Sequence, residues 1–298
     1  MTDLLPEGSG LAGAIAQARS AGRGTLSTSL MDLAARSDRS ITIDWATNTW
    51  TDATGDHALV APISAPEVWA AGVTYKTSRE ARLEETNQKA SFYADVYDAD
   101  RPELFLKDNA ERRTVGPGAP IGIRGDSHLT VPEPEFALVL DRDANIVGIT
   151  LGNDVTARDI EAANPLYLPQ AKIFSSSCAL GPAVTIFDEA VAVTDHFDIT
   201  LTITRGGAEV FAGETNTGQL NRRFSDLARH VSRYNVLADG TVLLTGTGVI
   251  PPLDFALRAG DVVQIASAQL GVLENPVKMI DEYPSAAPAP LAGQGVDA

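Results

Sequence analysis

Apolar and polar residues in the middle of the chain follow the pattern of two neighbouring β-strands. Residues 131–140 read Val-Pro-Glu-Pro-Glu-Phe-Ala-Leu-Val-Leu, and residues 146–154 read Ile-Val-Gly-Ile-Thr-Leu-Gly-Asn-Asp. The run Asp-Arg-Asp-Ala-Asn between them is polar, and polar residues between two apolar segments are typical of a hairpin turn. The sequence therefore predicts an antiparallel hairpin in which residues 136–140 pair with 146–150.

The rest of the chain alternates between short apolar segments and turn residues. We expect strands at 40–45, 68–73, 102–107, 170–174, 183–187, 197–205, 209–212, 241–244 and 261–269. Helical spacing occurs at 11–21, 30–35, 75–90, 155–163 and 221–234. Because few helices separate the strands, the pattern favours a mostly antiparallel α+β fold over a doubly wound parallel sheet.

Proline residues suggest where the chain divides. Pro62 and Pro66 punctuate the end of the leading segment, so we expect residues 1–65 to form a small N-terminal α+β domain. Residues 66–284 then form the larger, catalytic domain. The remaining residues, 285–298, are rich in Ala, Pro and Gly, and we expect them to be a disordered tail.

Composition and charge exclude several classes of partner. The chain has 298 residues, 44% hydrophobic, and a formal net charge of −16, which argues against nucleic acid or an anionic membrane surface as partner. No apolar run of about 18 residues predicts a membrane span, and residues 1–7 lack the features of a signal peptide, so we expect a cytoplasmic protein. The single cysteine, Cys178, excludes an intramolecular disulfide and is expected to be a small buried residue.

Three carboxylates stand out as candidate metal ligands. Glu133 and Glu135 are two residues apart in an extended segment, so both project from the same face. If the hairpin pairing continues, Asp154 lies beside them. Three carboxylates without His or Cys suit a hard divalent cation, Mg²⁺ or Mn²⁺. The alternative is that the two glutamates form a solvated strand face and that Asp154 caps a helix.

Residues 102–107 supply a second group of polar side chains. The alternation Pro-Glu-Leu-Phe-Leu-Lys places Glu103, Phe105 and Lys107 on one face of an extended strand. Glu103 is therefore a candidate general acid. Alternatively, Glu103 is a solvated residue of the strand without a catalytic role. Lys107 on the same face is a candidate for binding an anionic substrate.

Four motifs occur in one order over about residues 66 to 280. They are Glu133-Pro-Glu135, Asn153-Asp-Val-Thr-Ala-Arg-Asp159, Ala171-Lys172 and Thr245-Gly-Thr-Gly248. This ordered set resembles the fumarylacetoacetate hydrolase superfamily. The resemblance implies a mixed β-sandwich roll, mostly β, preceded by a small α+β domain and assembled as a homodimer or homotetramer.

The resemblance also implies roles for individual residues. It assigns Mg²⁺ binding to Glu133, Glu135 and Asp154, and the active-site lysine to Lys172. Thr247 corresponds to the threonine of the Thr-Gly-Thr turn, which with the amides of the turn is expected to bind the substrate carboxylate. Arg158 is expected either to contact substrate or to fix its helix onto the metal-binding strand.

The sequence departs from the hydrolases of this superfamily at important positions. Those enzymes carry Gly-x-Asn-Tyr-x-x-His, with a histidine thought to activate water, whereas residues 72–78 here read Gly-Val-Thr-Tyr-Lys-Thr-Ser. Ser78 cannot act alone as a base near neutral pH. A hydrolase glutamine near Arg158 is replaced by Glu161, and Gly248 stands where many relatives have proline. With these departures, the sequence resembles the branch of the superfamily that dehydrates 2-keto-3-deoxy sugar acids. The resemblance also rests on the segments 75–82, 101–105 and 164–172.

That branch implies a 2-keto-3-deoxypentonate as substrate and 2-oxoglutarate semialdehyde as product. Lys172 is then the candidate base or enolate stabiliser, although a salt bridge with the metal-binding carboxylates is an alternative role. Glu103 is expected to protonate the departing C4 hydroxyl. Ser78 and Arg79 are expected to contact the distal hydroxyls of the small-molecule 2-keto acid.

Two other functions remain open from the sequence. An acylpyruvate hydrolase or oxaloacetate decarboxylase of the same superfamily would use the same metal chelate but would break a C–C bond. A non-catalytic binding or subunit protein would retain only the scaffold. The presence of every candidate metal ligand, Lys172 and Thr247 argues against the non-catalytic alternative.

Overall fold

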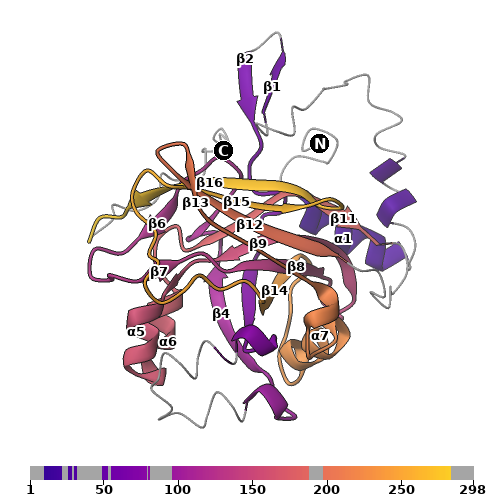
Figure 1. Ribbon diagram of the computed structural model, residues 1–298. Helices are drawn as coiled ribbons and strands as arrows, with labels where there is room; N and C mark the ends of the chain where they lie inside the picture. The colour runs from indigo at the N-terminus through magenta and orange to yellow at the C-terminus, as the bar shows by residue number, and fades with distance from the viewer. Residues whose placement is uncertain are drawn as a thin grey trace, which may run out of the picture.

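The computed structural model describes residues 10–21, 26–28, 30–31, 49–52, 55–78, 80, 96–187 and 197–282. Two β-sheets form most of this structure, with short helices at the ends of strands (Figure 1). The larger sheet has seven strands in the order β4 (Glu103–Asn109), β3 (Glu67–Gly72), β14 (Thr241–Thr247), β8 (Pro134–Leu140), β9 (Ile146–Asp154), β11 (Cys178–Ile186) and β5 (Thr114–Val115).

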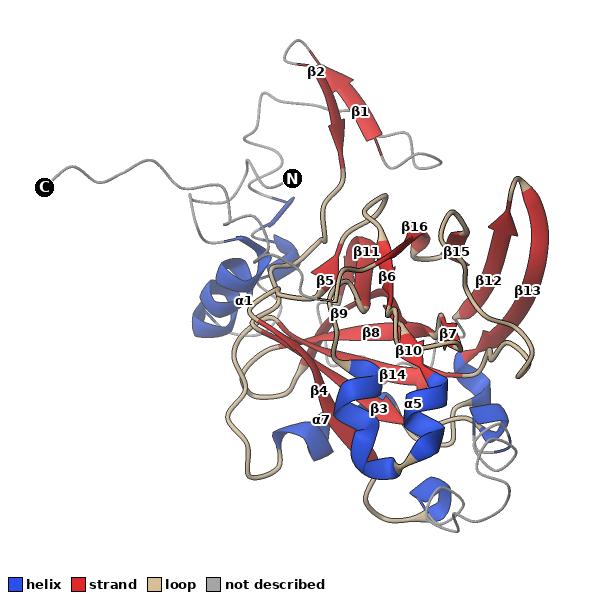
Figure 2. Ribbon diagram, turned by 90° about the vertical axis from the view of Figure 1, so that its left-hand side faces the viewer, coloured by secondary structure: helices blue, strands red, loops and turns tan. Residues whose placement is uncertain are grey.

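The smaller sheet has five strands in the order β13 (Ala208–Asn216), β12 (Asp198–Arg205), β15 (Val262–Ser267), β16 (Gly271–Met279) and β6 (Ile121–Ile123). Two further pairs complete the described strands: β1 (Thr49–Asp52) with β2 (Gly55–Ala58), and β7 (Thr130–Val131) with β10 (Thr156–Ala157). The β1–β2 hairpin projects from the body of the molecule in both views (Figures 1 and 2). The expected α+β fold, mostly β, is confirmed.

The helices are short and cover the sheets. In the described part of the chain, those with defined bounds are α1 (Gly10–Ala21), α5 (Arg158–Ala163), the 3₁₀ turn η2 (Pro165–Tyr167), α6 (Leu168–Lys172), the 3₁₀ turn η3 (Thr217–Gln219) and α7 (Phe224–Ser232), and further helical residues occur at 26–28, 76–78 and 96–98. Figure 2 shows α1 on one side of the molecule, and Figure 1 shows α5 and α6 side by side at the lower left. Among the described helices, none combines the length and hydropathy needed to cross a bilayer.

Strand β8 is buried on both faces, which explains its nearly continuous apolar sequence. Phe136 and Leu138 pack into a core shared with β12 and β15, whereas Ala137 and Val139 pack into a second core on the other face. Ile15 of α1 belongs to that second core. The helix therefore covers the outer face of the seven-stranded sheet, opposite the five-stranded sheet.

The predicted hairpin is confirmed by the pairing of β8 with β9. Ala137 pairs with Thr150 and Leu140 with Ile146, with a register shift between Val139 and Leu140. Most strand pairs are antiparallel as expected, but β3 runs parallel to β14, β5 to β11 and β6 to β16. These parallel pairs join distant segments, so local sequence patterns do not reveal them.

One predicted strand was wrong. Residues 170–174 were expected to be extended, but Leu168–Lys172 form helix α6. Pro165 and Pro169 lie in the first turns of η2 and α6, where the fixed backbone of proline favours helix initiation. A short apolar segment cannot be distinguished as strand or helix by periodicity alone.

Other expected boundaries changed or cannot be compared. The helix expected at 155–163 begins at Arg158, because Thr156 and Ala157 pair with β7. The predicted strand 40–45, residues 32–35, most of the helix expected at 75–90 and the tail 285–298 lie outside the described residues.

In the leading segment, Arg19 of α1 donates a hydrogen bond to Asp239 over 3.1 Å. The domain boundary at residue 65 stays an expectation.

Candidate active site

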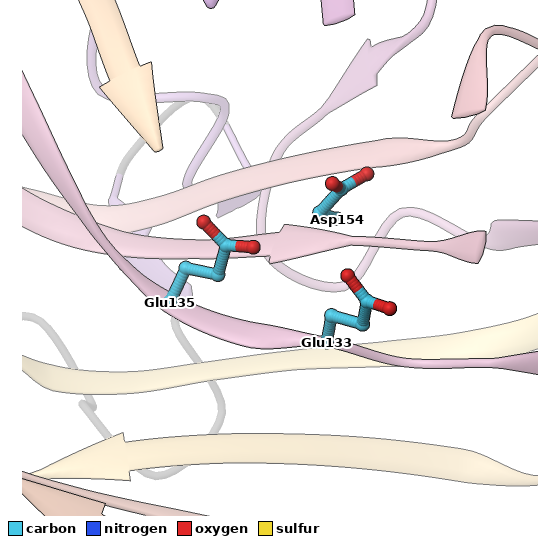
Figure 3. Close-up of side chains that lie close together, drawn as sticks. All are labelled: Glu133, Glu135 and Asp154. Carbon is cyan, nitrogen blue, oxygen red and sulfur yellow. The ribbon is translucent and has the colours of Figure 1, made fainter. Parts of the chain in front are cut away.

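Three carboxylates converge where β8 begins and β9 ends. Pro134 pairs with Asn153, and the amide of Asp154 donates to the carbonyl of Glu133 over 3.0 Å. Glu133, Glu135 and Asp154 each offer an oxygen, and these three oxygens lie within 4.8 Å of one another (Figure 3). All three side chains are buried. The hairpin thus brings the candidate metal ligands together as the sequence predicted.

The electrostatics of this cluster favour a bound cation. Burial, followed by the charges of Asp154 and Glu133, raises the pKa of Glu135 well above its usual value. Burial also opposes ionisation of Asp154, but Lys107 and Lys172 together hold the pKa of Asp154 below its usual value. The candidate ligand atoms are all carboxylate oxygens. The three acids outnumber the two lysines beside them. These features fit Mg²⁺ or Mn²⁺.

The Gly-rich turn at the end of β14 positions Glu135. The amide of Gly246 donates to Glu135 Oε2 over 2.6 Å. Gly246 has φ +90°, and a Cβ there would lie 2.0 Å from Thr74 Oγ1, so only glycine fits. The amides of this turn were expected to bind the substrate carboxylate. In the structure, the amide of Gly246 binds Glu135, which is a candidate metal ligand.

Lys172 lies at the end of α6 and reaches into the carboxylate cluster. Its Nζ lies 2.7 Å from Glu133 Oε2, 2.9 Å from Asp154 Oδ2 and 2.8 Å from Thr156 Oγ1. Two carboxylates and one hydroxyl therefore accept hydrogen bonds from Lys172. Lys172 also lines the cavity beside the cluster, so its position fits both the salt-bridge role and contact with substrate.

Lys107 is placed behind the cluster and does not line the cavity described below. Its side chain is 0% exposed, and its Nζ donates to the carbonyl of Val155 over 3.0 Å and to that of Lys172 over 2.5 Å. It also forms an ion pair with Asp154 Oδ1 at 2.5 Å. Lys107 therefore contacts a candidate metal ligand directly, and its expected role in substrate binding stays a prediction.

A cavity adjoins the three carboxylates. It is lined by Ala71, Gly72, Val73, Ser78, Glu103, Phe105, Glu133, Glu135, Asp154, Arg158, Glu161, Lys172, Gly246, Thr247 and Ile250. Its volume of about 20 Å³ is close to that needed for one water molecule. A wider hollow of about 380 Å³ shares Arg158 and Ile250 with it. The two spaces therefore adjoin each other at these residues.

The remaining predicted residues have varied surroundings. Ser78 lines the cavity, but its hydroxyl donates to the carbonyl of Tyr75 over 2.7 Å and accepts from the Tyr75 amide over 3.2 Å. Thr247 also lines the cavity, and its hydroxyl donates to the carbonyl of Val249 over 3.1 Å. Arg158 donates to the carbonyl of Pro251 over 2.9 Å. Arg79 lies outside the described residues.

No histidine occurs among the described residues that line the cavity. The imidazole of His128 lies 2.8 Å from Asp159 Oδ2, and its side chain is 87% exposed. His230 lies on α7. The described part of the cavity thus offers no imidazole to activate water.

The structure also places residues that the sequence analysis did not assign. Thr156 contacts Lys172, and the side-chain oxygen of Asn153 accepts from the amide of Glu133 over 3.1 Å. Glu161, noted only as a departure from the hydrolases, is buried in the cavity wall one turn after Arg158. That helical spacing was the available signal for Glu161, whereas the contacts of Thr156 depend on a pairing that local patterns do not show.

Comparison with known families agrees with this architecture. The model of the fumarylacetoacetate (FAA) hydrolase C-terminal domain matches residues 67–278. The chain belongs to this family. The matched segment includes every described residue that lines the cavity, so this site can be compared with the sites of other family members.

Individual relatives are also similar over most of the chain. A protein of Haloferax volcanii named as a probable 2-keto-3-deoxyxylonate dehydratase is 44% identical over 229 residues, 77% of this chain and 78% of the relative. The 2-dehydro-3-deoxy-D-arabinonate dehydratase of Saccharolobus solfataricus is 43% identical, with 75% of each chain covered. A structure of 2-keto-3-deoxy-D-arabinonate dehydratase complexed with magnesium and 2,5-dioxopentanoate has a TM-score of 0.73 at 37% identity, covering 86% of this chain and 89% of that chain.

Proposed function

We propose that this protein is a Mg²⁺-dependent hydro-lyase that dehydrates a 2-keto-3-deoxypentonate, such as 2-keto-3-deoxy-D-xylonate, to 2-oxoglutarate semialdehyde. The observation that carries the proposal is a buried cluster of three carboxylates beside Lys172 and Glu103 in a cavity whose described wall has no histidine. The relatives named as dehydratases, and the magnesium and 2,5-dioxopentanoate in one of their structures, support it.

The residues of the cavity suit this reaction. Glu133, Glu135 and Asp154 would hold the cation, which when bound would act as a Lewis acid toward the carboxylate and keto oxygens of the substrate. The Lys172 ammonium would stabilise negative charge on the keto oxygen as the C3 proton leaves, or would take that proton in its neutral form. Glu103 would give a proton to the C4 hydroxyl.

Atoms balance in this scheme. A C3–H bond and the C4–O bond break, and one water molecule leaves. One proton then leaves C5 and a second leaves the C5 hydroxyl, and one proton each is returned to C3 and C4, so that the hydroxyl-bearing C5 becomes the aldehyde. No oxidant and no attacking water are needed, which agrees with Ser78 standing where the hydrolases have histidine.

The test is an assay of the purified chain with 2-keto-3-deoxypentonates, an acylpyruvate and oxaloacetate, with and without a chelator. We expect the product 2-oxoglutarate semialdehyde, which is 2,5-dioxopentanoate, to be detected by NMR only with the deoxy acid and only without the chelator. Loss of a water-activating base costs about 10²- to 10⁴-fold, so cleavage of the acylpyruvate should be slow by that factor. Efficient acylpyruvate cleavage with no semialdehyde from any deoxy acid would refute the proposal.

Assembly and location complete the proposal. We expect a homodimer or homotetramer formed through the domain that contains residues 66–284, located in the cytoplasm. The family membership supports self-association. Sedimentation of the purified chain at micromolar concentration tests it, and a monomer alone would contradict it.

A further inference from the structure

Gly72 and Glu103 face each other on neighbouring strands at the cavity. Gly72 ends β3, Glu103 begins β4, and the two residues pair directly in the antiparallel ladder. Both line the cavity. A Cβ atom on Gly72 would lie 2.0 Å from Glu103 Oε2 and 2.8 Å from its Cδ. The Glu103 carboxyl group therefore folds back over the Cα of Gly72 and occupies the space that any other residue at this position would fill.

The glycine is required by this contact and not by the backbone. The φ of Gly72 lies outside the left-handed range, in contrast to Gly246 at φ +90°. The three atoms that a Cβ on Gly72 would approach most closely all belong to Glu103, and the third is its Cγ at 3.3 Å. An alanine at this position would thus conflict with the end of one flexible side chain, and that side chain can move away at small cost in stability.

We propose that Gly72 is a positioning residue for the general acid: its missing side chain creates the space that holds the Glu103 carboxyl in the cavity. This inference rests on the proposed function for the role of Glu103. It explains why a strand that is otherwise Glu-Val-Trp-Ala-Ala ends in glycine at the cavity. Strand interiors disfavour glycine unless another group approaches closely, and here that group is a carboxyl.

The experiment compares Gly72→Ala with the unmodified chain in the dehydration assay. We expect kcat to fall by about 10²-fold, because a displaced acid forfeits most of the 10²- to 10⁴-fold that acid catalysis contributes. KM and the Mg²⁺ concentration for half-maximal activity should stay within about twofold, since the carboxylate cluster is unchanged. The melting temperature should fall by less than about 3 °C.

A second substitution provides the rescue. Glu103→Asp shortens the acid by one methylene, so in the Gly72→Ala background the carboxyl can return to the cavity beside the new methyl group. We expect the double variant to recover at least about tenfold in kcat over Gly72→Ala. Glu103→Asp alone should be slower than the unmodified chain. Gly125→Ala is the matched control, because a Cβ at Gly125 meets nothing within 4 Å.

The outcomes separate this inference from the proposed function. If Glu103→Gln reduces kcat but Gly72→Ala does not, Gly72 has no positioning role. If Glu103→Gln keeps full activity, Glu103 is not the general acid and this inference is overturned, while the proposed dehydration stands. If the unmodified chain does not dehydrate the substrate, the proposed function fails. The contact itself is still tested by melting temperatures of Gly72→Ala, Glu103→Gly and the double variant, because the penalty of alanine should disappear when Glu103 is removed.

A folding defect would also be informative. If Gly72→Ala does not fold but Gly72→Ala with Glu103→Gly does, the conflict lies between these two side chains, as proposed. If neither folds, another part of the structure requires the glycine and the inference is overturned.

Discussion

Lys107 is a single residue whose position depends on an irregularity in the pairing of β3 with β4. Period-2 alternation correctly placed Glu103 and Phe105 in one cavity wall. The same rule placed Lys107 beside them, but the β3–β4 pairing passes from Leu106 to Asp108 and leaves Lys107 as the extra residue of a bulge. A bulge redirects its side chain, and a long-range pairing of this kind is not visible in the local sequence.

The position of Lys107 leads to a prediction for Lys107→Met. This change leaves Asp154 with one ammonium fewer and removes a donor to the carbonyl of Lys172. Loss of one partner of a buried pair costs about 3 to 5 kcal/mol. We expect a large loss of stability without metal by urea unfolding, partly offset by Mg²⁺ because it supplies the missing positive charge, and a lower kcat with KM little changed. Lys278→Met on the exposed side of β16 is the control, and a raised KM with unchanged metal binding would instead indicate a substrate contact.

Glu135→Gln tests the carboxylate cluster from the inside. Glutamine preserves an oxygen that can accept from the Gly246 amide, and it removes one of three neighbouring negative charges. We expect the metal-free variant to be at least as stable as the unmodified chain in urea, because like charges separated by a few ångströms repel. Mg²⁺ binding should weaken at least about tenfold, as for loss of a charged ligand. Glu209→Gln, on β13, is the control, and unchanged Mg²⁺ affinity would remove Glu135 from the ligand set.

At the scale of elements, strong and local patterns were predictive. The β8–β9 hairpin, the turn before β13 and the amphipathic helix α7 are all where the sequence indicated. Helix α6 was assigned as a strand because five residues are too few to show a period. The parallel pairing of β3 with β14 was unpredictable for another reason, since it joins segments about 170 residues apart. The site depends on both kinds of element.

A partly buried ion pair joins the end of β12 to the residue before β15, two neighbouring strands inside the smaller sheet. Arg205 on β12 donates to both oxygens of Asp261 over 2.7 and 2.8 Å, just before β15 begins. Burial opposes the charge of Asp261, but the hydrogen bond from Arg205 and the amide of Arg258 hold its pKa below the usual 3.8. Asp261→Asn should lower the free energy of unfolding by about 2 kcal/mol at neutral pH.

The pH dependence of this effect has a definite sign. A carboxyl whose pKa is lower in the folded chain stabilises the fold above its unfolded pKa, and this contribution is lost as the pH falls through the lowered folded value. The difference between the unmodified chain and Asp261→Asn should therefore be complete above about pH 5 and shrink below 3.8. Urea unfolding at several pH values measures it. A difference that grows toward acid pH would contradict the assigned cause.

At the scale of the whole molecule, the site exists only in the folded chain. The candidate metal ligands come from β8, the residue before it and β9, Lys172 from α6, Glu103 from β4 and the supporting amide from β14. The convergence of the three candidate metal ligands was predictable because they lie at the ends of one hairpin. Their neighbours were assigned through resemblance to a family, since their convergence depends on the order of strands in the seven-stranded sheet. Any ligand of this cluster must therefore be coupled to global stability.

This coupling predicts that Mg²⁺ stabilises the entire fold. A ligand that binds only the folded state adds about 2.7 kcal/mol at a concentration 100 times its Kd. For a chain of this size that corresponds to a rise of about 5 °C in melting temperature, measured by calorimetry after removal of metal with a chelator. Glu135→Gln should abolish most of the rise, and Glu209→Gln should preserve it. An unmodified chain whose melting temperature does not respond to millimolar Mg²⁺ or Mn²⁺ would show that the three carboxylates do not form a metal site.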